Sequence, residues 1–373
     1  MQQVKYNKNE YLKLKKLLST HKPENICVVH TKRSYKDSGA EAFINELIGN
    51  SYAEFTEFEP NPKFGDLKKG LDLINPQKFS LIIAIGGGTA IDIAKMLKAL
   101  AYKKCNLENI IKGEEQITDP GIPMLAIPTT SGTGSEATQF SVMYIGKKKY
   151  SISTEYIYPE YVYLDPSFSM SAPPYLTACT GLDALCQAVE ALWCVNATDE
   201  SNSYAEEAIS LVHKNLRIAV NKNSEEAKSA MQTSAYLAGK AINITRTTAP
   251  HALSYAFTSY YGIPHGHAVA ISLPFFVKFN YAVSDVDCMD KRGADAVRKR
   301  IELFFKAFNT DDENVTNDLL EFFSNIGIET TISRLIEKFD RSIIINNVNT
   351  QRLGNNPRKV TNEAIAQFIN CTI

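Results

Sequence analysis

The sequence predicts an α/β fold with two domains. Residues 1–168 should form a domain with a mostly parallel sheet, because short apolar runs alternate there with amphipathic stretches, as in βαβ units. Residues 169–373 should form an all-α domain, because the periodic segments after Pro174 have helical spacing. The length of 373 residues agrees with two domains, since single cores stop growing near roughly 250–300 residues.

Each expected element has its own signal. Fully apolar runs of strand length predict three buried strands, at Ile26–Val29, Leu81–Ile85 and Met124–Ile127. Between them, amphipathic patterns predict helices at Ala40–Leu47 and Ile91–Leu100. Residues 150–166 alternate as a strand does and lead to a turn at Pro173 and Pro174. The helices expected in the second domain are Tyr175–Trp193, Ser201–Asn215, Ser224–Ile244 and Ala294–Phe308.

Composition excludes several classes of protein. Hydrophobic residues make up 44% of the chain and charged residues 22%, as in ordinary globular proteins. With 40 basic and 41 acidic residues, binding of nucleic acid through bulk charge is not expected. No apolar run is long enough to cross a bilayer, so no membrane association is expected. Seven scattered cysteines without a CxxC pair, and a polar N-terminus, predict a reducing, cytoplasmic location.

A glycine-rich turn joins the second expected strand to a helix. Gly86, Gly87 and Gly88 follow the strand directly, and Thr89 and Asp92 lie in the first helical turns. Glycine lets the backbone approach a bound group closely, and the N-terminus of a helix attracts phosphate. The context favours a pyrophosphate site, although the loop is neither GxGxxG nor a Walker A motif. A tight turn that binds nothing is the alternative.

A second polar loop follows the third expected strand. Its hydroxyl groups and free amides suit a diphosphate or a nicotinamide carboxamide, although such a loop can also simply cap a helix. Two such loops after successive parallel strands favour a Rossmann-like dinucleotide-binding domain. The hydroxyl residues of the loop are Thr129, Thr130, Ser131, Thr133 and Ser135.

The second domain contains a group of residues with the spacing of metal ligands. Asp183 and Gln187 are four residues apart on one helical face, and Glu190 extends that face. His251, His265 and His267 fall within 17 residues of sequence. One carboxylate, one amide oxygen and two imidazoles can surround a divalent cation. Histidines that only pack in the core are the alternative, and spacing alone leaves both interpretations open.

With these motifs the chain resembles the iron-containing (group III) alcohol dehydrogenase family. The resemblance extends from about residue 25 to the NNPRKVTNEAI segment near the end, and it depends on four motifs in order. It implies an N-terminal dinucleotide-binding domain, a C-terminal helical domain and a site in the cleft between them. The motifs are GGGTAIDIAK (86–95), PTTSGTGSEAT (128–138), TGLDALCQAVEA (180–191) and a pair of histidines 14 residues apart.

The resemblance also implies roles for individual residues. The metal ligands of the family correspond to Asp183, Gln187, His251 and His265, and the metal would be Fe²⁺ or Zn²⁺. Gln187 departs from the family, where most members have histidine, and this departure puts iron specificity and metal affinity in question. Tyr255 stands where many members have a histidine near the substrate, so it could relay a proton or only pack.

Two further positions belong to the expected cofactor site, Lys149 and Leu182.

The segment GKAINITRTTAPHALSYAFTSYYGIPHGHA is most similar to the phosphonoacetaldehyde reductase branch of that family. That branch converts phosphonoacetaldehyde to 2-hydroxyethylphosphonate. A phosphonate needs a cationic partner, ideally a guanidinium, and Lys240, Asn243 and Arg246 recur at helix-like spacing just before His251. We therefore expect these three residues to bind substrate, with a solvated helix face as the alternative.

Cofactor preference can be argued from the end of the first strand. Members that prefer NAD carry an aspartate at the position of Thr31, and an acidic residue there usually binds the ribose 2′-OH. Thr31 has no carboxylate to repel a 2′-phosphate, and Lys32 or Arg33 could attract one. The sequence therefore predicts NADP(H) over NAD(H).

The expected reaction is metal-dependent reduction of a small aldehyde, possibly bearing a phosphonate, to a primary alcohol. Hydride would come from nicotinamide C4, the cation would stabilise charge on the aldehyde oxygen, and the proton would come from water, His267 or Tyr255. His267 could instead only orient its loop. A non-redox metal lyase or cyclase, a glycerol-1-phosphate dehydrogenase-like enzyme and a binding protein without activity are the alternatives. Because relatives often associate, a homodimer is expected.

Overall fold

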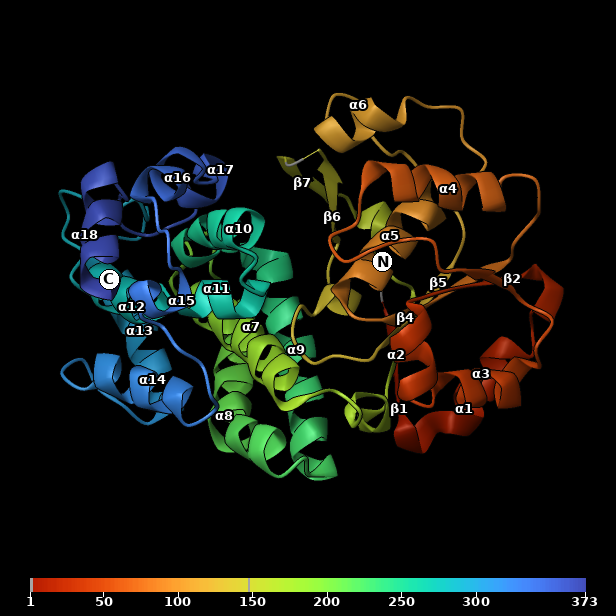
Figure 1. Cartoon of the computed structure of the whole chain (residues 1–373), viewed down its shortest axis with the longest axis horizontal. Helices are drawn as coiled ribbons and strands as arrows, with labels where there is room; N and C mark the ends of the chain where they lie inside the picture. The colour runs from red at the N-terminus through yellow and green to blue at the C-terminus, as the bar shows by residue number, and fades with distance from the viewer. Residues whose placement is uncertain (1–2, 147) are drawn as a thin grey trace. The chain divides into compact units, whose positions relative to one another are not determined.

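The computed structural model describes residues 3–146 and 148–373, and the chain divides into two compact units (Figure 1). The first contains residues 1–130 and 134–172, and the second contains residues 131–133 and 173–373. The division therefore differs from a single cut after residue 168. The main crossing point lies at Pro173, and the short segment Ser131–Thr133 of the polar loop groups with the helical unit.

The first unit is built on a parallel sheet of six strands in the order β1-β8-β5-β4-β2-β3. Its central strands β2, β4 and β5 are buried along their whole length, which explains why their sequences are apolar apart from His30 at the end of β2. The register pairs His30 with Ile85 and Gly86 with Pro128, so these three strands end at the same edge. The strands of this sheet are β1 (Val4–Asn7), β2 (Ile26–His30), β3 (Ala53–Phe55), β4 (Leu81–Gly86), β5 (Met124–Pro128) and β8 (Tyr161–Leu164).

Helices accompany the sheet, and a separate hairpin completes the unit. Strands β6 (Phe140–Ile145) and β7 (Lys148–Ser153) pair in antiparallel fashion. Helix α5 follows β4 after the glycine turn, and ten of its 13 residues are buried. The helices of this unit are α1 (Tyr11–Leu18), α2 (Lys32–Asp37), α3 (Ala40–Ile48), α4 (Phe64–Ile74), α5 (Gly88–Leu100) and α6 (Leu107–Lys112).

The second unit is a bundle of helices around α7, which is buried along nearly its whole length. Small residues let neighbouring helices approach α7 closely. A Cβ added at Gly181 would meet Leu216 Cδ1 of α8 at 2.3 Å, for example. The helices are α7 (Pro174–Trp193), α8 (Asp199–Asn221), α9 (Glu225–Thr245), α10 (Ala249–Tyr261), α11 (His265–Ala270), α12 (Leu273–Tyr281), α13 (Ala294–Phe308), α14 (Val315–Ser324), α15 (Ile332–Leu335), α16 (Arg341–Asn346), α17 (Thr350–Leu353) and α18 (Asn362–Thr372).

The predicted fold class is confirmed: a mostly parallel sheet in the N-terminal part and an all-α C-terminal part. The segment 150–166 differs in detail from a single alternating strand, because it contains the end of β7, a 3-10 turn and then β8. None of the helices in residues 3–146 and 148–373 has the length and apolar character that crossing a membrane requires.

Candidate metal and nucleotide sites

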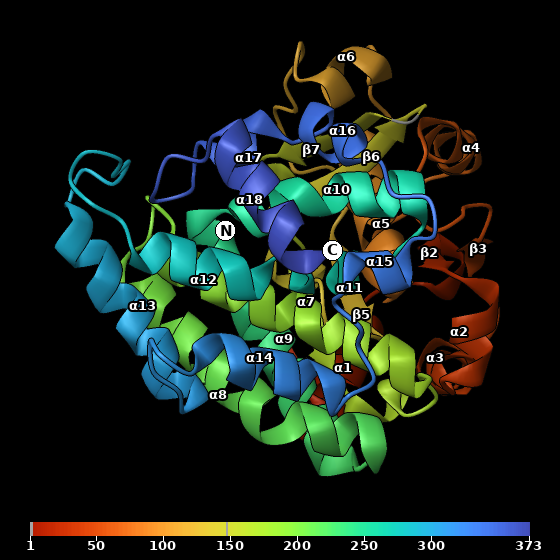
Figure 2. The same cartoon turned by 60° about the vertical axis from the view of Figure 1, so that its left-hand side comes forward.

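Three side chains that are far apart in sequence converge within the helical unit. Asp183 of α7, His251 of α10 and His265 at the start of α11 place one ligand atom each within 4.8 Å of one another. His251 Nε2 lies 3.4 Å from Asp183 Oδ1, and His265 Nε2 lies 3.9 Å from the same oxygen. Figures 1 and 2 show α7, α10 and α11 side by side. One carboxylate and two imidazoles at this spacing match the three protein ligands of a catalytic metal site.

The three clustered residues differ in how far their side chains are exposed to solvent. The side chains of Asp183 and His251 are each 5% exposed, whereas that of His265 is 32% exposed. The cluster is therefore closed on the side of α7 and α10 and open beside His265. Catalytic metal sites keep such an open position for substrate, whereas structural sites are closed.

A buried carboxylate orients His251. Glu190, one turn before the end of α7, lies 2.6 Å from His251 Nδ1 and also accepts a bond of 3.2 Å from the His251 backbone N–H. Both Thr248 N–H and Thr248 Oγ1–H donate to the same carboxylate. When the ring is neutral, as a metal ligand must be, Nδ1 donates to Glu190 and the lone pair of the imidazole lies on Nε2, which faces Asp183. This is the arrangement that metal-binding histidines usually have.

Charge around His251 shifts its titration. Burial by itself would lower the pKa of His251, but Glu190 and Asp183 outweigh it and raise that pKa to about 9. The protein thus stabilises positive charge between these two carboxylates. A divalent cation would replace the proton there, because the same two acids attract it.

Gln187 lies one turn after Asp183 on α7 and is buried. Its Nε2 donates to Thr133 O at 3.3 Å, while its Oε1 has no hydrogen-bond partner among the described residues. A buried carbonyl oxygen without a partner is costly unless a cation or water satisfies it. The donor set of Asp183, two imidazoles and this oxygen therefore fits a borderline divalent ion such as Fe²⁺ or Zn²⁺.

His267 occupies a different environment from the two preceding histidines. It is 3% exposed, its Nε2 lies 2.6 Å from Glu329 O, and its Nδ1 lies 2.9 Å from Tyr175 Oη. A carbonyl only accepts, so Nε2 carries the hydrogen and Nδ1 accepts from the phenol. Burial lowers the pKa of His267. These contacts favour an orienting role over direct proton delivery.

Tyr255 follows His251 by one turn of α10. Its ring stacks on that of His265, with centroids 6.1 Å apart and an interplanar angle of 19°. Its phenol is half-buried, so both of the roles expected for it, proton relay and packing, are compatible with its position beside the cluster.

The three expected substrate residues do not share one environment. Lys240 Nζ lies 5.6 Å from the Tyr204 ring centroid, toward α8. Asn243 is half-buried on α9. Arg246 ends that helix with a φ of +80°, and its side chain is half-buried.

The expected cofactor residues of the first unit gather where β2, β4 and β5 end. Gly86 has a φ of +150°, and a Cβ added there would meet Ala90 Cβ at 2.8 Å and Thr31 Oγ1 at 3.9 Å. A Cβ added at Gly87 would lie 3.2 Å from Thr130 Oγ1. Gly87 caps the 13-residue helix α5, which begins at Gly88 and continues through Thr89. Glycine is favoured most strongly at Gly86, where a side chain would collide with Ala90 and strain the backbone, whereas at Gly87 a Cβ would require Thr130 to shift.

Asp92 and Ser135 are bonded to each other. Asp92 Oδ1 accepts from Ser135 Oγ–H at 2.5 Å, and Asp92 Oδ2 accepts from Val142 N–H at 2.9 Å. Lys95 Nζ, which is buried, donates to Ser135 Oγ at 3.0 Å. The charge of Lys149 also acts on Asp92, whose pKa burial raises. These bonds connect α5 to the polar loop and to the hairpin, so they fix the shape of the loop.

The remaining residues of the polar loop are divided between the units. Thr129 N–H donates to Gly86 O at 3.0 Å within the first unit. In the helical unit Ser131 is buried, and a Cβ added at the neighbouring Gly132 would lie 2.7 Å from Thr180 Cβ. Leu182 is fully buried on α7.

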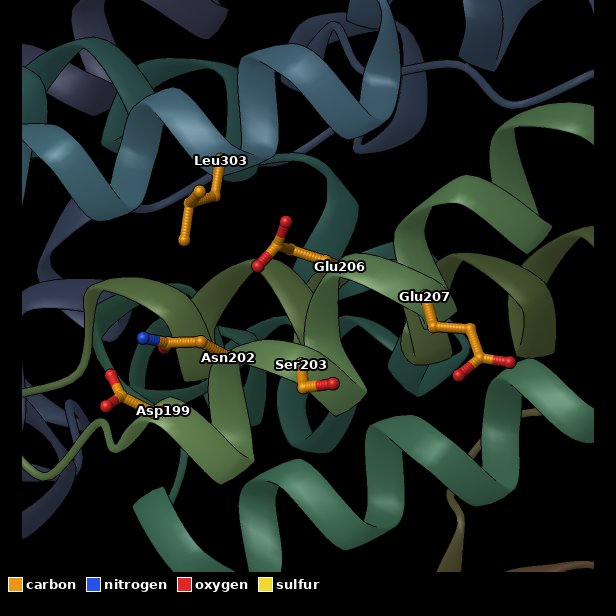
Figure 3. Close-up of a pocket in the computed structure, with 6 residues that line it drawn as sticks. All are labelled: Asp199, Asn202, Ser203, Glu206, Glu207 and Leu303. Carbon is orange, nitrogen blue, oxygen red and sulfur yellow. The ribbon is translucent and has the colours of Figure 1, made fainter.

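A cavity elsewhere in the helical unit lacks the donor set of a metal site like the one above. A cavity of about 460 Å³ is lined by residues of α8 and by Leu303 of α13 (Figure 3). Its polar groups are carboxylates, an amide and a hydroxyl, without a histidine among the lining residues. Figure 3 shows Glu206 and Glu207 directed to different sides of α8, so they do not converge on one ion. The residues of α8 that line it are Asp199, Asn202, Ser203, Glu206 and Glu207.

Comparison of the sequence with models of known families identifies the family of this chain. The model of the iron-containing alcohol dehydrogenases matches residues 2–166, and that of the C-terminal domain of the Fe-containing alcohol dehydrogenase family matches residues 177–372. The chain belongs to the iron-containing alcohol dehydrogenase family. The resemblance carried by the four motifs is thus confirmed.

Relatives within the iron-containing alcohol dehydrogenase family include several named enzymes. The chain is 36% identical over 234 residues to long-chain-alcohol dehydrogenase 1 of Geobacillus thermodenitrificans, covering 62% of this chain and 59% of that protein. It is 29% identical over 299 residues to phosphonoacetaldehyde reductase of Streptomyces viridochromogenes, covering 77% of this chain and 74% of that protein.

Solved structures of the family are similar along the whole chain. Sulfoacetaldehyde reductase from Bifidobacterium kashiwanohense, solved in complex with NAD⁺, has a TM-score of 0.89 at 27% identity and covers 99% of this chain and 96% of its own. A 1,3-propanediol oxidoreductase has a TM-score of 0.86 at 25% identity, with 99% and 98% covered.

Sequence reasoning found the three clustered residues, the glycine turn and the position of Glu190, but it missed the role of Glu190 and the other residues beside the cluster. Glu190 shares a helical face with Asp183, which was the available signal for its role. Ser254, whose Oγ lies 3.4 Å from His265 Nδ1, carried no signal. Neither did Arg352, whose Cζ lies 5.9 Å from the Tyr255 ring.

Proposed function

We propose that this protein is a metal-dependent enzyme that reduces a small aldehyde to a primary alcohol with NAD(P)H. The observation that carries the proposal is the convergence of Asp183, His251 and His265 within 4.8 Å, with Glu190 orienting His251. Family membership supports the same reaction class, because the relatives are alcohol dehydrogenases and aldehyde reductases.

The glycine turn supports a nicotinamide dinucleotide as the second reactant. Gly86, Gly87 and the N-terminus of α5 form a compact cradle beside Thr31 and Thr130, which suits a pyrophosphate. The similar sulfoacetaldehyde reductase was solved with NAD⁺. Asp92, Lys95 and Ser135 would act indirectly by holding the loop that contains Thr129 and Ser131.

Each residue near the cluster can then be assigned a role in the proposed reaction. A divalent cation at the cluster would supply a Lewis acid that stabilises negative charge growing on the substrate oxygen. Asp183 and the two imidazoles hold it, Gln187 offers a neutral oxygen, and Glu190 keeps His251 Nε2 directed at the cluster. Bound NAD(P)H would supply a hydride to the carbonyl carbon, and the substrate oxygen would gain one proton. Tyr255, stacked on His265, or water supplies that proton, because His267 is engaged by Glu329 and Tyr175.

NADP(H) remains the proposed form of the cofactor. Thr31 follows the buried strand β2 directly and has no carboxylate, and its Oγ1 contacts Ser34 Oγ. A 2′-phosphate would meet hydroxyl groups there instead of a negative charge. We expect kcat/KM with NADPH to exceed that with NADH by tenfold or more. A tenfold preference for NADH would contradict this part of the proposal.

The proposed reaction is tested by measuring metal content and turnover in the same variants. His265→Ala should lose bound metal and aldehyde reduction together, because it removes one of three clustered ligands. His21→Gln in the first unit, remote in sequence from the cluster, is the matched control and should keep both. Metal content is measured in the same preparation in which the near-ultraviolet absorbance of the reduced cofactor is followed. Full turnover by a metal-free protein after chelation would refute the metal role.

The substrate we propose is a small aldehyde with a phosphonate or a similar group, phosphonoacetaldehyde first. The similarity to phosphonoacetaldehyde reductase and to sulfoacetaldehyde reductase supports a short, anionic aldehyde. A panel of phosphonoacetaldehyde with uncharged aldehydes of similar size tests the choice. The cytoplasmic location and the homodimer expected from the sequence stay predictions.

A further inference from the structure

Two arginines, Arg246 and Arg352, adjoin one turn near the metal cluster, within the helical unit. Arg352 lies on α17, and its Nη1 donates to the hydroxyl of Thr247, the residue after Arg246. Asn355 Nδ2 donates to Thr247 O at 3.0 Å, so the same turn is held from two sides. Burial first, and then the positive charge of Arg352, lower the pKa of Arg246. Two cations that repel each other in a half-buried place would be stabilised by an anion between them.

Arg352 has no acidic partner in the part of the chain that the structure describes. Its side chain contacts the Thr247 hydroxyl and the face of Tyr255, and it forms no ion pair with any carboxylate among residues 3–146 and 148–373. Other arginines of this unit differ. Arg300 bonds Asp290 at 2.5 Å, and Arg358 bonds Asp287 at 2.6 Å. A half-buried guanidinium without an acid keeps its donors for a ligand.

Tyr255 connects this pair of arginines to the metal cluster. The Arg352 Cζ lies 5.9 Å from the Tyr255 ring centroid, and the His265 ring lies 6.1 Å from the same centroid. The segment from Arg246 to His251 makes a second connection, because Glu190 bonds both Thr248 and His251 within it. Figures 1 and 2 show α17 beside α10, which carries His251 and Tyr255.

Lys240, by contrast, is directed elsewhere. Its ammonium lies over the Tyr204 ring of α8 at 5.6 Å, so its charge is shared with that ring. The cationic site is therefore not the Lys240–Arg246 helix face that the sequence spacing suggested. It combines Arg246 with Arg352, which is distant in sequence: Thr247 and Arg352 are 105 residues apart.

We propose that Arg246, Arg352 and the Thr247 turn form the binding site for a tetrahedral oxyanion, a phosphonate or a sulfonate, on the carbon next to the aldehyde. The proposal rests on the proposed function and names the substrate class of that site. A two-carbon aldehyde spans roughly 4–5 Å from its carbonyl oxygen to its terminal anion. Arg352 and His265 both lie beside the Tyr255 ring, 5.9 Å and 6.1 Å from its centroid, so one short substrate would place its carbonyl at the Asp183–His251–His265 cluster and its anion at Arg352. The fork of a guanidinium matches two oxygens of such an anion.

The test compares charged and uncharged aldehydes in wild type and in Arg352→Gln. For phosphonoacetaldehyde and sulfoacetaldehyde, we expect KM to rise by about 10- to 150-fold in Arg352→Gln, as for the loss of a hydrogen bond to a charged group, with kcat within threefold. For propionaldehyde, kcat/KM should stay within twofold, which also shows that the variant is folded. Arg217→Gln, an exposed arginine of α8, is the matched control and should change nothing.

A second variant and a simple anion make the test independent of one substitution. Arg352→Lys keeps the charge but loses the fork, so its KM for both charged aldehydes should fall between those of wild type and Arg352→Gln. Inorganic phosphate should inhibit propionaldehyde reduction competitively against aldehyde in wild type, and at least tenfold more weakly in Arg352→Gln. The ratio of KM values for the phosphonate and the sulfonate shows which anion the site prefers.

Three results would overturn the inference. One is a KM for both charged aldehydes that stays within twofold in Arg352→Gln. Another is a wild type that reduces propionaldehyde as efficiently as the charged aldehydes, which would leave the proposed reaction intact but remove the anion site. The third is a metal-loaded wild type that reduces no aldehyde with either cofactor, which would refute the proposed function and the inference that rests on it.

Discussion

Glu190 is the single residue on which the geometry of the candidate metal site depends most. It is fully buried and forms hydrogen bonds with the backbone N–H and with the ring Nδ1 of His251. It also accepts from Thr248, whose hydroxyl in turn accepts from Trp193 Nε1 at 2.8 Å. One carboxylate thus sets the ring orientation and the tautomer of a ligand and positions the first turn of α10.

Replacement of this carboxylate should weaken the metal site without removing a ligand. For Glu190→Gln we expect a 10- to 100-fold loss of metal affinity, as is typical when an outer partner of a histidine ligand is changed. Competition with a chelator of known affinity measures it. Glu207→Gln, an exposed glutamate on α8, should keep wild-type affinity. Equal affinities in both variants would show that Glu190 does not orient His251.

Lys228 gives the helical unit a stability that depends on pH. It is 2% exposed, its Nζ donates to Thr177 Oγ1 at 2.6 Å, and burial lowers its pKa to about 8. In the unfolded chain the pKa returns to about 10.4. Between these values the unfolded chain binds more protons, so the free energy of unfolding should rise with pH, by up to about 1.4 kcal/mol per unit.

Lys228→Met tests this pH dependence, because methionine fills similar space without a charge. Below pH 8 the lysine is protonated in both states, so the difference in free energy of unfolding between wild type and variant should be constant. From pH 8 to about 10.4 wild type should gain relative to the variant. Chemical denaturation at several pH values measures the difference. A difference that stays flat across this window would contradict the burial of an ionisable amine.

At the scale of elements, the close packing of α11 on α7 positions His265. Gly266 follows this histidine directly, and a Cβ added there would lie 1.9 Å from Cys179 O of α7. The backbone of α7 cannot yield as a flexible side chain can. The first turn of α11 can therefore approach α7 only through a glycine, and this approach brings His265 near Asp183.

Gly266→Ala should therefore displace α11. We expect a loss of about 1–3 kcal/mol in the free energy of unfolding, as for overpacking, together with weaker metal binding. Gly65→Ala is the matched control, because no atom lies within 4 Å of a Cβ added there, and in helix α4 it should be neutral or slightly stabilising. Thermal unfolding and metal content are the measurements. A Gly266→Ala variant with wild-type stability would mean that the two helices can separate without cost.

At the scale of the whole molecule, the two candidate sites have different frameworks. The glycine turn depends on the register of β2, β4 and β5, which brings three strand ends to one edge. The metal cluster depends on α7, α10 and α11, and all three of its residues lie in the helical unit. Each site is therefore stabilised by the core of its own unit.

Metal binding should therefore slow backbone amide exchange mainly in the helical unit. On addition of Zn²⁺ to the metal-free protein, backbone amides of α7, α10 and α11 should exchange more slowly, while those of β2 and β4 change little. The reason is that a ligand stabilises the state that it binds, by about 2.7 kcal/mol at a concentration 100 times its Kd. Hydrogen exchange with peptide resolution measures this, and Asp183→Asn should abolish the protection. Equal protection of both units would contradict a site built within one.

Much of this architecture could be predicted because its signals are local. The buried strands are almost wholly apolar and end in glycine or polar loops, and α7 is rich in small and apolar residues. The sequence pattern did not predict strand β1. Val4–Asn7 is partly polar, and it forms a strand by pairing with β8. Local periodicity does not reveal a partner more than 150 residues away in the sequence.

The sequence by itself determined the fold class, the buried central strands and the glycine turn, because local apolar runs and residue type carry that information. It also named four candidate metal ligands, through the resemblance of its motifs to a known family. Only the tertiary structure decided that Glu190 orients His251, that His267 is bonded to Glu329 and Tyr175, and that Arg352 bonds Thr247 beside Arg246. Side chains from distant segments meet only when the helices pack, and packing depends on the shape of the whole core. For that reason the reactive residues could be named from the chain alone, whereas their partners could not.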